Sequence, residues 1–143
     1  MLAVLSCPLV QAEGGSANVT LEVNIVAPLS VITDEARGVG TRRATLSGSL
    51  TSLGTASSAN VSFGYDTQSR AEDAYANWTP PEVMTGTGTF SARVVDLFTG
   101  TTYYFRAKAE GDVTSYGKEM SFTTTPKGRW WRWLESLISW LGL

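Results

Sequence analysis

Apolar residues recur at every second position in several short runs along the chain. The alternation is clearest over 18–27, where Val19, Leu21, Val23 and Ile25 are separated by polar residues. A period of two is that of a β-strand with one buried face. Six further short runs show it, at 29–33, 43–50, 60–66, 89–96, 102–110 and 118–124. Turn-forming residues bound each run, so the pattern predicts an all-β, antiparallel sandwich.

The stretch 67–81 departs from this alternation. It is polar, long for a hairpin connection, and ends in Pro80-Pro81. We expect a loop with a helical turn before Trp78 and an exposed sheet edge at the two prolines.

The C-terminal segment 127–143 has a helical period instead. Placed on a helix at about 100° per residue, its apolar side chains fall on one half of the circumference. They are Trp130, Trp131, Trp133, Leu134, Leu137, Ile138, Trp140 and Leu141. This predicts an amphipathic, tryptophan-rich helix. At about 1.5 Å per residue it is too short to span a bilayer.

Two kinds of partner suit this helix. Tryptophan rings favour the depth of lipid headgroups, and Lys127 and Arg129 would meet anionic lipid there. The apolar face would equally suit protein, either the sandwich of the same chain or a second copy. The sequence leaves both open.

The N-terminal residues 1–12 are apolar and uncharged, and they end in Val10-Gln11-Ala12. Small residues at these positions suit a signal peptidase, so we interpret 1–12 as a truncated signal peptide cleaved after Ala12. A lipoprotein-type signal at Cys7 and a loosely packed terminus are the alternatives. Residues 13–27 would then form a lead-in strand before the sandwich.

Composition argues against most chemistry. The net charge is −2 without a basic stripe, which disfavours nucleic acid as a partner, and histidine is absent. Cys7 is the single cysteine, so the chain can form no internal disulfide. The acidic pairs Asp34-Glu35 and Glu72-Asp73 fall in expected loops, where solvated charges are usual. We therefore expect no catalytic, cofactor-binding or metal-binding residues, and no enzyme.

The stretch "LFTGTTYYFRAKA", which begins at Leu97, carries a family resemblance. Its spacing resembles the E–F corner and F strand of fibronectin type III domains, which are immunoglobulin-like sandwiches. The likeness covers about residues 28–125, and we expect the sandwich domain to span 28–126. In that family a tyrosine hydroxyl reaches back to the backbone just upstream and fixes the corner. The resemblance implies that Tyr103 has this structural role.

The chain departs from the family at two places. Thr99 stands where the family usually has proline, and Leu46 lies on the strand where it has a core tryptophan. We expect Phe63, Phe90 and Tyr103 to fill the core instead.

These observations favour a non-enzymatic extracellular or cell-surface module for adhesion, spacing or display. Its C-terminal helix would attach it to a membrane interface or to a protein partner. One alternative is a carbohydrate-binding module, with Tyr75 and Trp78 as the candidate sugar platform. Another is an assembly subunit that lends residues 18–27 to the sheet edge of a neighbour.

Overall fold

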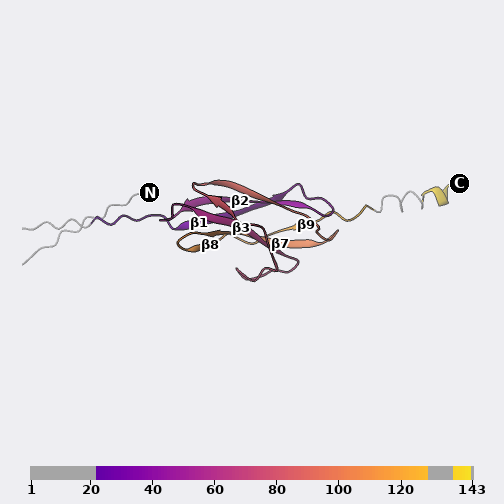
Figure 1. Ribbon diagram of the computed structural model, residues 1–143. Coiled ribbons are helices and arrows are strands. Elements are labelled where there is room, and N and C mark those ends of the chain that lie inside the picture. The colour runs from indigo at the N-terminus through magenta and orange to yellow at the C-terminus, as the bar shows by residue number, and fades with distance from the viewer. Residues whose placement is uncertain (1–21, 129–136, 143) are drawn as a thin grey trace, which may run out of the picture.

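The strands of this protein form two antiparallel sheets, seen in a computed structural model that describes residues 22–128 and 137–142 (Figure 1). The smaller sheet has the order β1-β2-β6. Its strands are β1 (Leu29–Arg37), β2 (Ala44–Leu53) and β6 (Gly88–Val94).

The larger sheet is built around two central strands, β3 (Ala59–Asp66) and β7 (Thr102–Glu110). Short strands extend it on both sides. They are β4 (Asn77–Trp78) and β5 (Glu82–Met84) beside β3, and β8 (Thr114–Tyr116) and β9 (Met120–Thr123) beside β7. The predicted antiparallel β-sandwich is confirmed.

Side chains that alternate along each strand fill the space between the sheets. In β2, Leu46 and Leu50 are buried, whereas Thr45 and Ser47 lie on the outer face. The register of β1 shifts between Asp34 and Arg37, where a bulge interrupts the ladder with β2.

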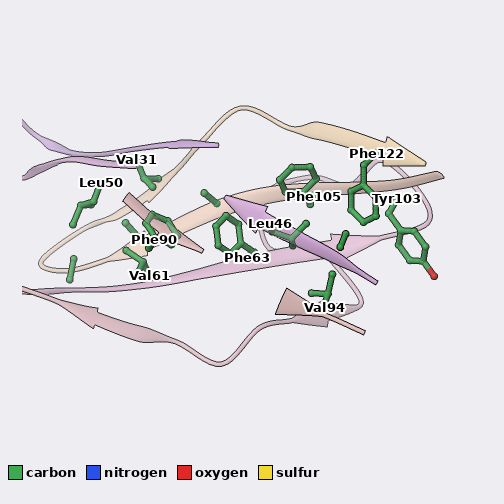
Figure 2. Packing of buried hydrophobic residues seen from close by; sticks show 14 of the residues in the cluster. Val31, Leu46, Leu50, Val61, Phe63, Phe90, Val94, Tyr103, Phe105 and Phe122 are labelled. Carbon is green, nitrogen blue, oxygen red and sulfur yellow. The ribbon is translucent and has the colours of Figure 1, made fainter. Parts of the chain in front are cut away.

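Aromatic rings occupy the centre and one end of the core (Figure 2). Phe63 and Phe90 lie together with ring centroids 4.9 Å apart, and Tyr103 stacks on Phe122 at 5.6 Å. Phe63, Phe90 and Tyr103 are all buried, so they fill the core as predicted. Gly48 faces two of these rings. A Cβ atom there would lie 2.9 Å from Phe90 and 3.2 Å from Phe63.

The chain approaches the sandwich at one end through residues 22–28 and leaves at the other through 124–128 (Figure 1). The lead-in strand expected over 13–27 is not formed in its described part, because residues 22–27 are exposed and belong to no strand. The alternation of apolar and polar residues in this segment would give a strand one apolar face. A strand also needs a neighbouring strand for its hydrogen bonds, and the alternation does not provide one. Residues 13–21 and the expected signal peptide 1–12 lie outside the described residues.

Candidate functional site

Three segments meet where the chain leaves the sandwich, and we call this end the C-terminal pole. They are the loop 38–43, the corner 95–101 and the exit segment 124–128. Backbone hydrogen bonds join them. The N–H of Leu97 donates to the carbonyl of Arg42 at 3.1 Å, and the N–H of Thr125 donates to that of Gly40 at 3.0 Å. The pole is therefore one ordered surface formed by three loops.

Tyr103 fixes the corner within this pole. Its ring is buried, and its hydroxyl oxygen accepts a hydrogen bond of 3.0 Å from the backbone N–H of Phe98. The Thr124 hydroxyl donates to the carbonyl of Phe98 at 2.6 Å. The backbone of Phe98 is thus held from both sides, in the arrangement of a tyrosine corner.

The side chain of Phe98 nevertheless points into solvent. Phe98 is 72% exposed and Val95, at the start of the same corner, is 52% exposed. Sequence reasoning missed both residues as site candidates. The sequence does place both residues in a turn between strands. Apolar residues in a turn belong to no buried strand face, and this could have marked them as exposed.

The described part of the C-terminal segment contains one helical turn, over residues 137–140. The N–H of Leu141 donates to the carbonyl of Leu137 at 3.0 Å, as in an α-helix. Leu137, Ile138 and Leu141 are exposed, and Trp140 is 88% exposed. The other expected contact residues, Trp130, Trp131, Trp133 and Leu134, lie outside the described residues. The apolar side chains that are described thus have little cover from the rest of the described chain.

Tyr75 and Trp78 do not form an exposed, coplanar pair. Tyr75 is only 4% exposed, and the two rings stand at 87° with centroids 6.0 Å apart. Both rings pack over Gly64 of β3, where a Cβ atom would lie 2.9 Å from the ring of Tyr75. The pair covers the outer face of the larger sheet, because glycine leaves room for it. It lacks the flat exposed surface on which a sugar would stack.

Glu119, which precedes β9, binds the loop that carries Tyr75. Its carboxylate accepts hydrogen bonds from the Tyr75 hydroxyl, from the Ser69 hydroxyl at 2.6 Å and from the N–H of Arg70 at 3.1 Å. Burial tends to raise the pKa of Glu119, but these hydrogen bonds outweigh it and hold that pKa below its usual value. Burial, followed by the hydrogen bond to Glu119, raises the pKa of Tyr75.

Lys108 of β7 makes a second set of contacts on this face. Its Nζ lies 3.2 Å from a carboxylate oxygen of Asp73 and 5.0 Å from the centroid of the Trp78 ring. Burial and the hydrogen bond to Asp73 raise the pKa of Tyr116, across the ladder, to about 12. The charged groups of this face bind one another, so the network fastens the loop 67–76 to the sheet. Its partners are far apart in sequence, which is why spacing could not reveal it.

The described residues also bear on metals and membranes. Among residues 22–128 and 137–142, no cluster of three or more acidic or cysteine side chains is placed to hold a metal ion. Within the same ranges, no helix has both the length and the apolar character needed to cross a bilayer.

The fold itself is a known one. No protein-family model matches the sequence, and no curated protein matches it. Among solved structures, the chain is similar to the sensor domain of the anti-sigma factor RsgI4 of Pseudobacteroides cellulosolvens, with 21% identity and a TM-score of 0.56. That match covers 71% of this chain and 99% of the sensor domain. The solution structure of the same sensor domain matches with 18% identity and a TM-score of 0.57, over 70% and 77% of the two chains.

A fibronectin type III domain of the human KIAA0970 protein is also similar, with 16% identity and a TM-score of 0.48 over 68% of this chain and 74% of that one. The two antiparallel sheets and the tyrosine corner of this chain are those of a fibronectin type III-like fold, as the sequence resemblance predicted. Identities this low describe the fold alone.

Proposed function

We propose that this protein is a non-enzymatic surface module, for adhesion, spacing or display, which its C-terminal helix attaches to an anionic membrane. The observation that carries the proposal is the exposure of apolar side chains on the described turn of that helix, above all Trp140. In water such side chains are unfavourable unless a partner covers them.

The chemistry of the segment favours lipid as that partner. Tryptophan is the residue that suits the headgroup region best, and Lys127, Arg129 and Arg132 would lie beside anionic headgroups. Burying several indole and leucine side chains contributes about 25 cal/mol per Å² of apolar surface, which amounts to several kcal/mol before the cost of ordering the helix. Binding should therefore be reversible and should weaken as salt is added.

Location outside the cell is part of the proposal. It is supported by the signal-like sequence of residues 1–12. A sandwich of the same fold serves as the sensor domain of an anti-sigma factor, so the fold suits a role that does not involve catalysis.

Vesicle sedimentation tests this attachment. The full chain is mixed with phosphatidylcholine vesicles, with or without phosphatidylserine, and the pelleted fraction is measured together with tryptophan emission. We expect Trp140→Glu to abolish most of the binding. The neighbouring Ser139→Glu adds the same charge on the polar face and should weaken binding much less. If the unmodified chain stays in the supernatant and its emission does not move, attachment to membranes is refuted, and self-association should be measured instead.

The lead-in segment supports a second candidate function, that of an assembly subunit. Val23 and Ile25 alternate with polar residues as in a strand, yet both are exposed and unpaired within the described structure. Such a segment could add to the sheet edge of a second copy. Sedimentation equilibrium decides between the two, because a monomer at high concentration would exclude strand exchange.

A further inference from the structure

Basic residues gather around the C-terminal pole. Four of them lie in the loop 38–43 or at nearby strand ends, and one lies in the exit segment: Arg37, Arg42, Arg43, Arg93 and Lys127. Three carboxylates, those of Asp34, Glu35 and Asp96, lie among or beside these five cations, so the formal charge of the pole with its adjoining strand ends is +2. None of the ion pairs found among the described residues involves any of the five cations.

The opposite end of the sandwich has the other sign. Its described loops and the approach segment contain Glu22, Glu110 and Asp112 but neither lysine nor arginine. Glu110 is paired with Lys108 of β7, and Glu22 and Asp112 have no ion pair in the described part of the chain. The overall charge of −2 therefore conceals a charge separation along the long axis of the sandwich. A molecule with this separation turns its basic pole toward an anionic surface.

The pole is also hollowed beside its arginines. One hollow of about 600 Å³ is lined by Gly40, Thr41, Arg42, Arg43, Val95 and Asp96. A second, of about 300 Å³, is lined by Gly38, Arg43, Ala44, Thr45 and Arg93. Arg43 lines both hollows, so guanidinium groups border each of them. Guanidinium groups bind phosphate oxygens with paired hydrogen bonds, so these open depressions present suitable donors to a phosphate headgroup.

One exposed apolar side chain stands next to these cations, and a second lies on the same corner. Val95 lines the larger hollow, and Phe98 lies three residues further along the same corner. The backbone of Phe98 is already fixed by the hydroxyls of Tyr103 and Thr124. Immersing the ring in a lipid surface would therefore order little further backbone, and pre-ordered contacts of this kind strengthen binding.

We propose that the C-terminal pole is a second membrane-binding site, distinct from the helix, in which Phe98 and Val95 enter the headgroup layer while Arg42 and Arg43 bind lipid phosphates. This inference rests on the proposed function only in that both place the same end of the molecule at a membrane. Its consequence is geometric: the sandwich stands with its long axis away from the lipid surface.

The basic charge of the pole favours anionic lipid as its partner over a second copy of the chain or the chain's own C-terminal segment. A second copy docking pole to pole would bring the two sets of arginines together, and like charges oppose such a symmetric contact. The C-terminal segment of the same chain carries Arg129 and Arg132 against one carboxylate, that of Glu135, so it is also basic. An anionic phospholipid surface complements both the charge and the apolar side chains.

Vesicle binding by the full chain tests this site. We expect Phe98→Ser, and separately Arg42→Gln with Arg43→Gln, to weaken binding to vesicles that contain phosphatidylserine. A basic residue near an anionic surface contributes roughly five-fold in affinity, so the double arginine variant should lose more than ten-fold. Val113→Ser and Lys118→Gln, which are exposed away from the pole, are the matched controls and should bind as the unmodified chain does.

Depth measurements give a readout that does not depend on affinity. With Cys7 replaced by serine, a spin label at Phe98→Cys should be immersed in the bilayer, and a label at Val113→Cys should remain in water. Equal exposure of the two labels on bound vesicles would overturn the inference. Inorganic phosphate provides the remaining comparison. If phosphate perturbs Arg42 and Arg43 while the Phe98→Ser variant binds vesicles normally, the hollows are a site for free anions and the inference also fails.

The two proposals can fail separately. If Trp140→Glu abolishes binding and Phe98→Ser does not change it, attachment by the helix stands and the second site is refuted. If Phe98→Ser weakens binding and Trp140→Glu does not, the second site stands and attachment by the helix is refuted.

Discussion

The hydroxyl oxygen of Tyr103 accepts a hydrogen bond from the backbone N–H of Phe98, whose side chain is exposed at the corner. Replacing Tyr103 by phenylalanine keeps the ring that stacks on Phe122 but leaves this N–H without its acceptor. We expect Tyr103→Phe to lower the free energy of unfolding by about 1–2 kcal/mol. Urea unfolding measures the change. Tyr104→Phe, at the neighbouring outward position, is the control, and equal effects of the two variants would show that the hydroxyl of Tyr103 has no special role.

Gly48 is a second residue whose identity the core dictates. An added Cβ atom would lie 2.9 Å from the ring of Phe90 and 3.0 Å from the carbonyl oxygen of Ile32. Backbone cannot move aside easily, so we expect Gly48→Ala to cost about 1–3 kcal/mol of stability through overpacking. Gly86→Ala provides the comparison, since a Cβ atom there would meet nothing within 4 Å. The melting temperatures of both variants test this expectation. A melting temperature of Gly48→Ala equal to that of the unmodified chain would contradict it.

At the scale of elements, the loop 67–76 depends on the ionised form of Glu119. Because the folded-state pKa of Glu119 is depressed, its carboxylate stabilises the fold above the unfolded-state pKa of about 4.3. This stabilisation is lost as the pH falls through the lower folded-state pKa. We expect the loop to loosen in acid before the sandwich unfolds.

Hydrogen exchange of the backbone amide of Arg70 follows this loosening, since that N–H donates to Glu119. Glu119→Gln should raise its exchange at neutral pH and remove most of the acid dependence. Glu72→Gln alters a carboxylate that is exposed on the same loop. It should change neither the exchange of the Arg70 amide at neutral pH nor its dependence on acid. Protection that is independent of pH in the unmodified chain would show that another contact holds the loop.

The long strands were predictable because each has its own buried face. The alternation of Leu46 and Leu50 in β2, or of Tyr103 and Phe105 in β7, is visible without any neighbour. The short strands β4, β5 and β8 have two or three residues each, too few to show a period, so their pairing with β3 and β7 is a consequence of tertiary structure.

The surface sites were less predictable than the strands. The apolar face of 127–143 is visible in sequence because a helical period places its residues on one side. The arginines around the pole come from β1, β6 and the loop 38–43, and only the folded sandwich brings Arg42 and Arg43 beside Val95. The aromatic pair Tyr75 and Trp78 shows the opposite error, because closeness in sequence suggested an exposed pair that the fold turns onto Gly64.

At the scale of the whole molecule, the buried hydrophobic core runs from Leu29 to Phe122 and includes no residue of the C-terminal segment that is described. We therefore expect a chain that ends at Gly128 to unfold at the same urea concentration as the full chain. Sandwich stability would then be independent of the helix, as attachment to an outside surface requires. A clear loss of stability on truncation would show that residues 129–143 pack on their own sandwich.

The entry and exit of the chain at opposite ends also determine how the sandwich responds to mechanical load. A force applied between residues 22 and 128 would pull β1 toward one end and β9 toward the other, each along its own ladder. The ladder of β1 with β2 extends from Leu29 to Arg37, and its hydrogen bonds lie across the direction of pulling. Many of them must then break together in shear, whereas a hairpin pulled open from one end loses them one at a time. The fold should consequently resist stretching along its axis better than its modest size suggests.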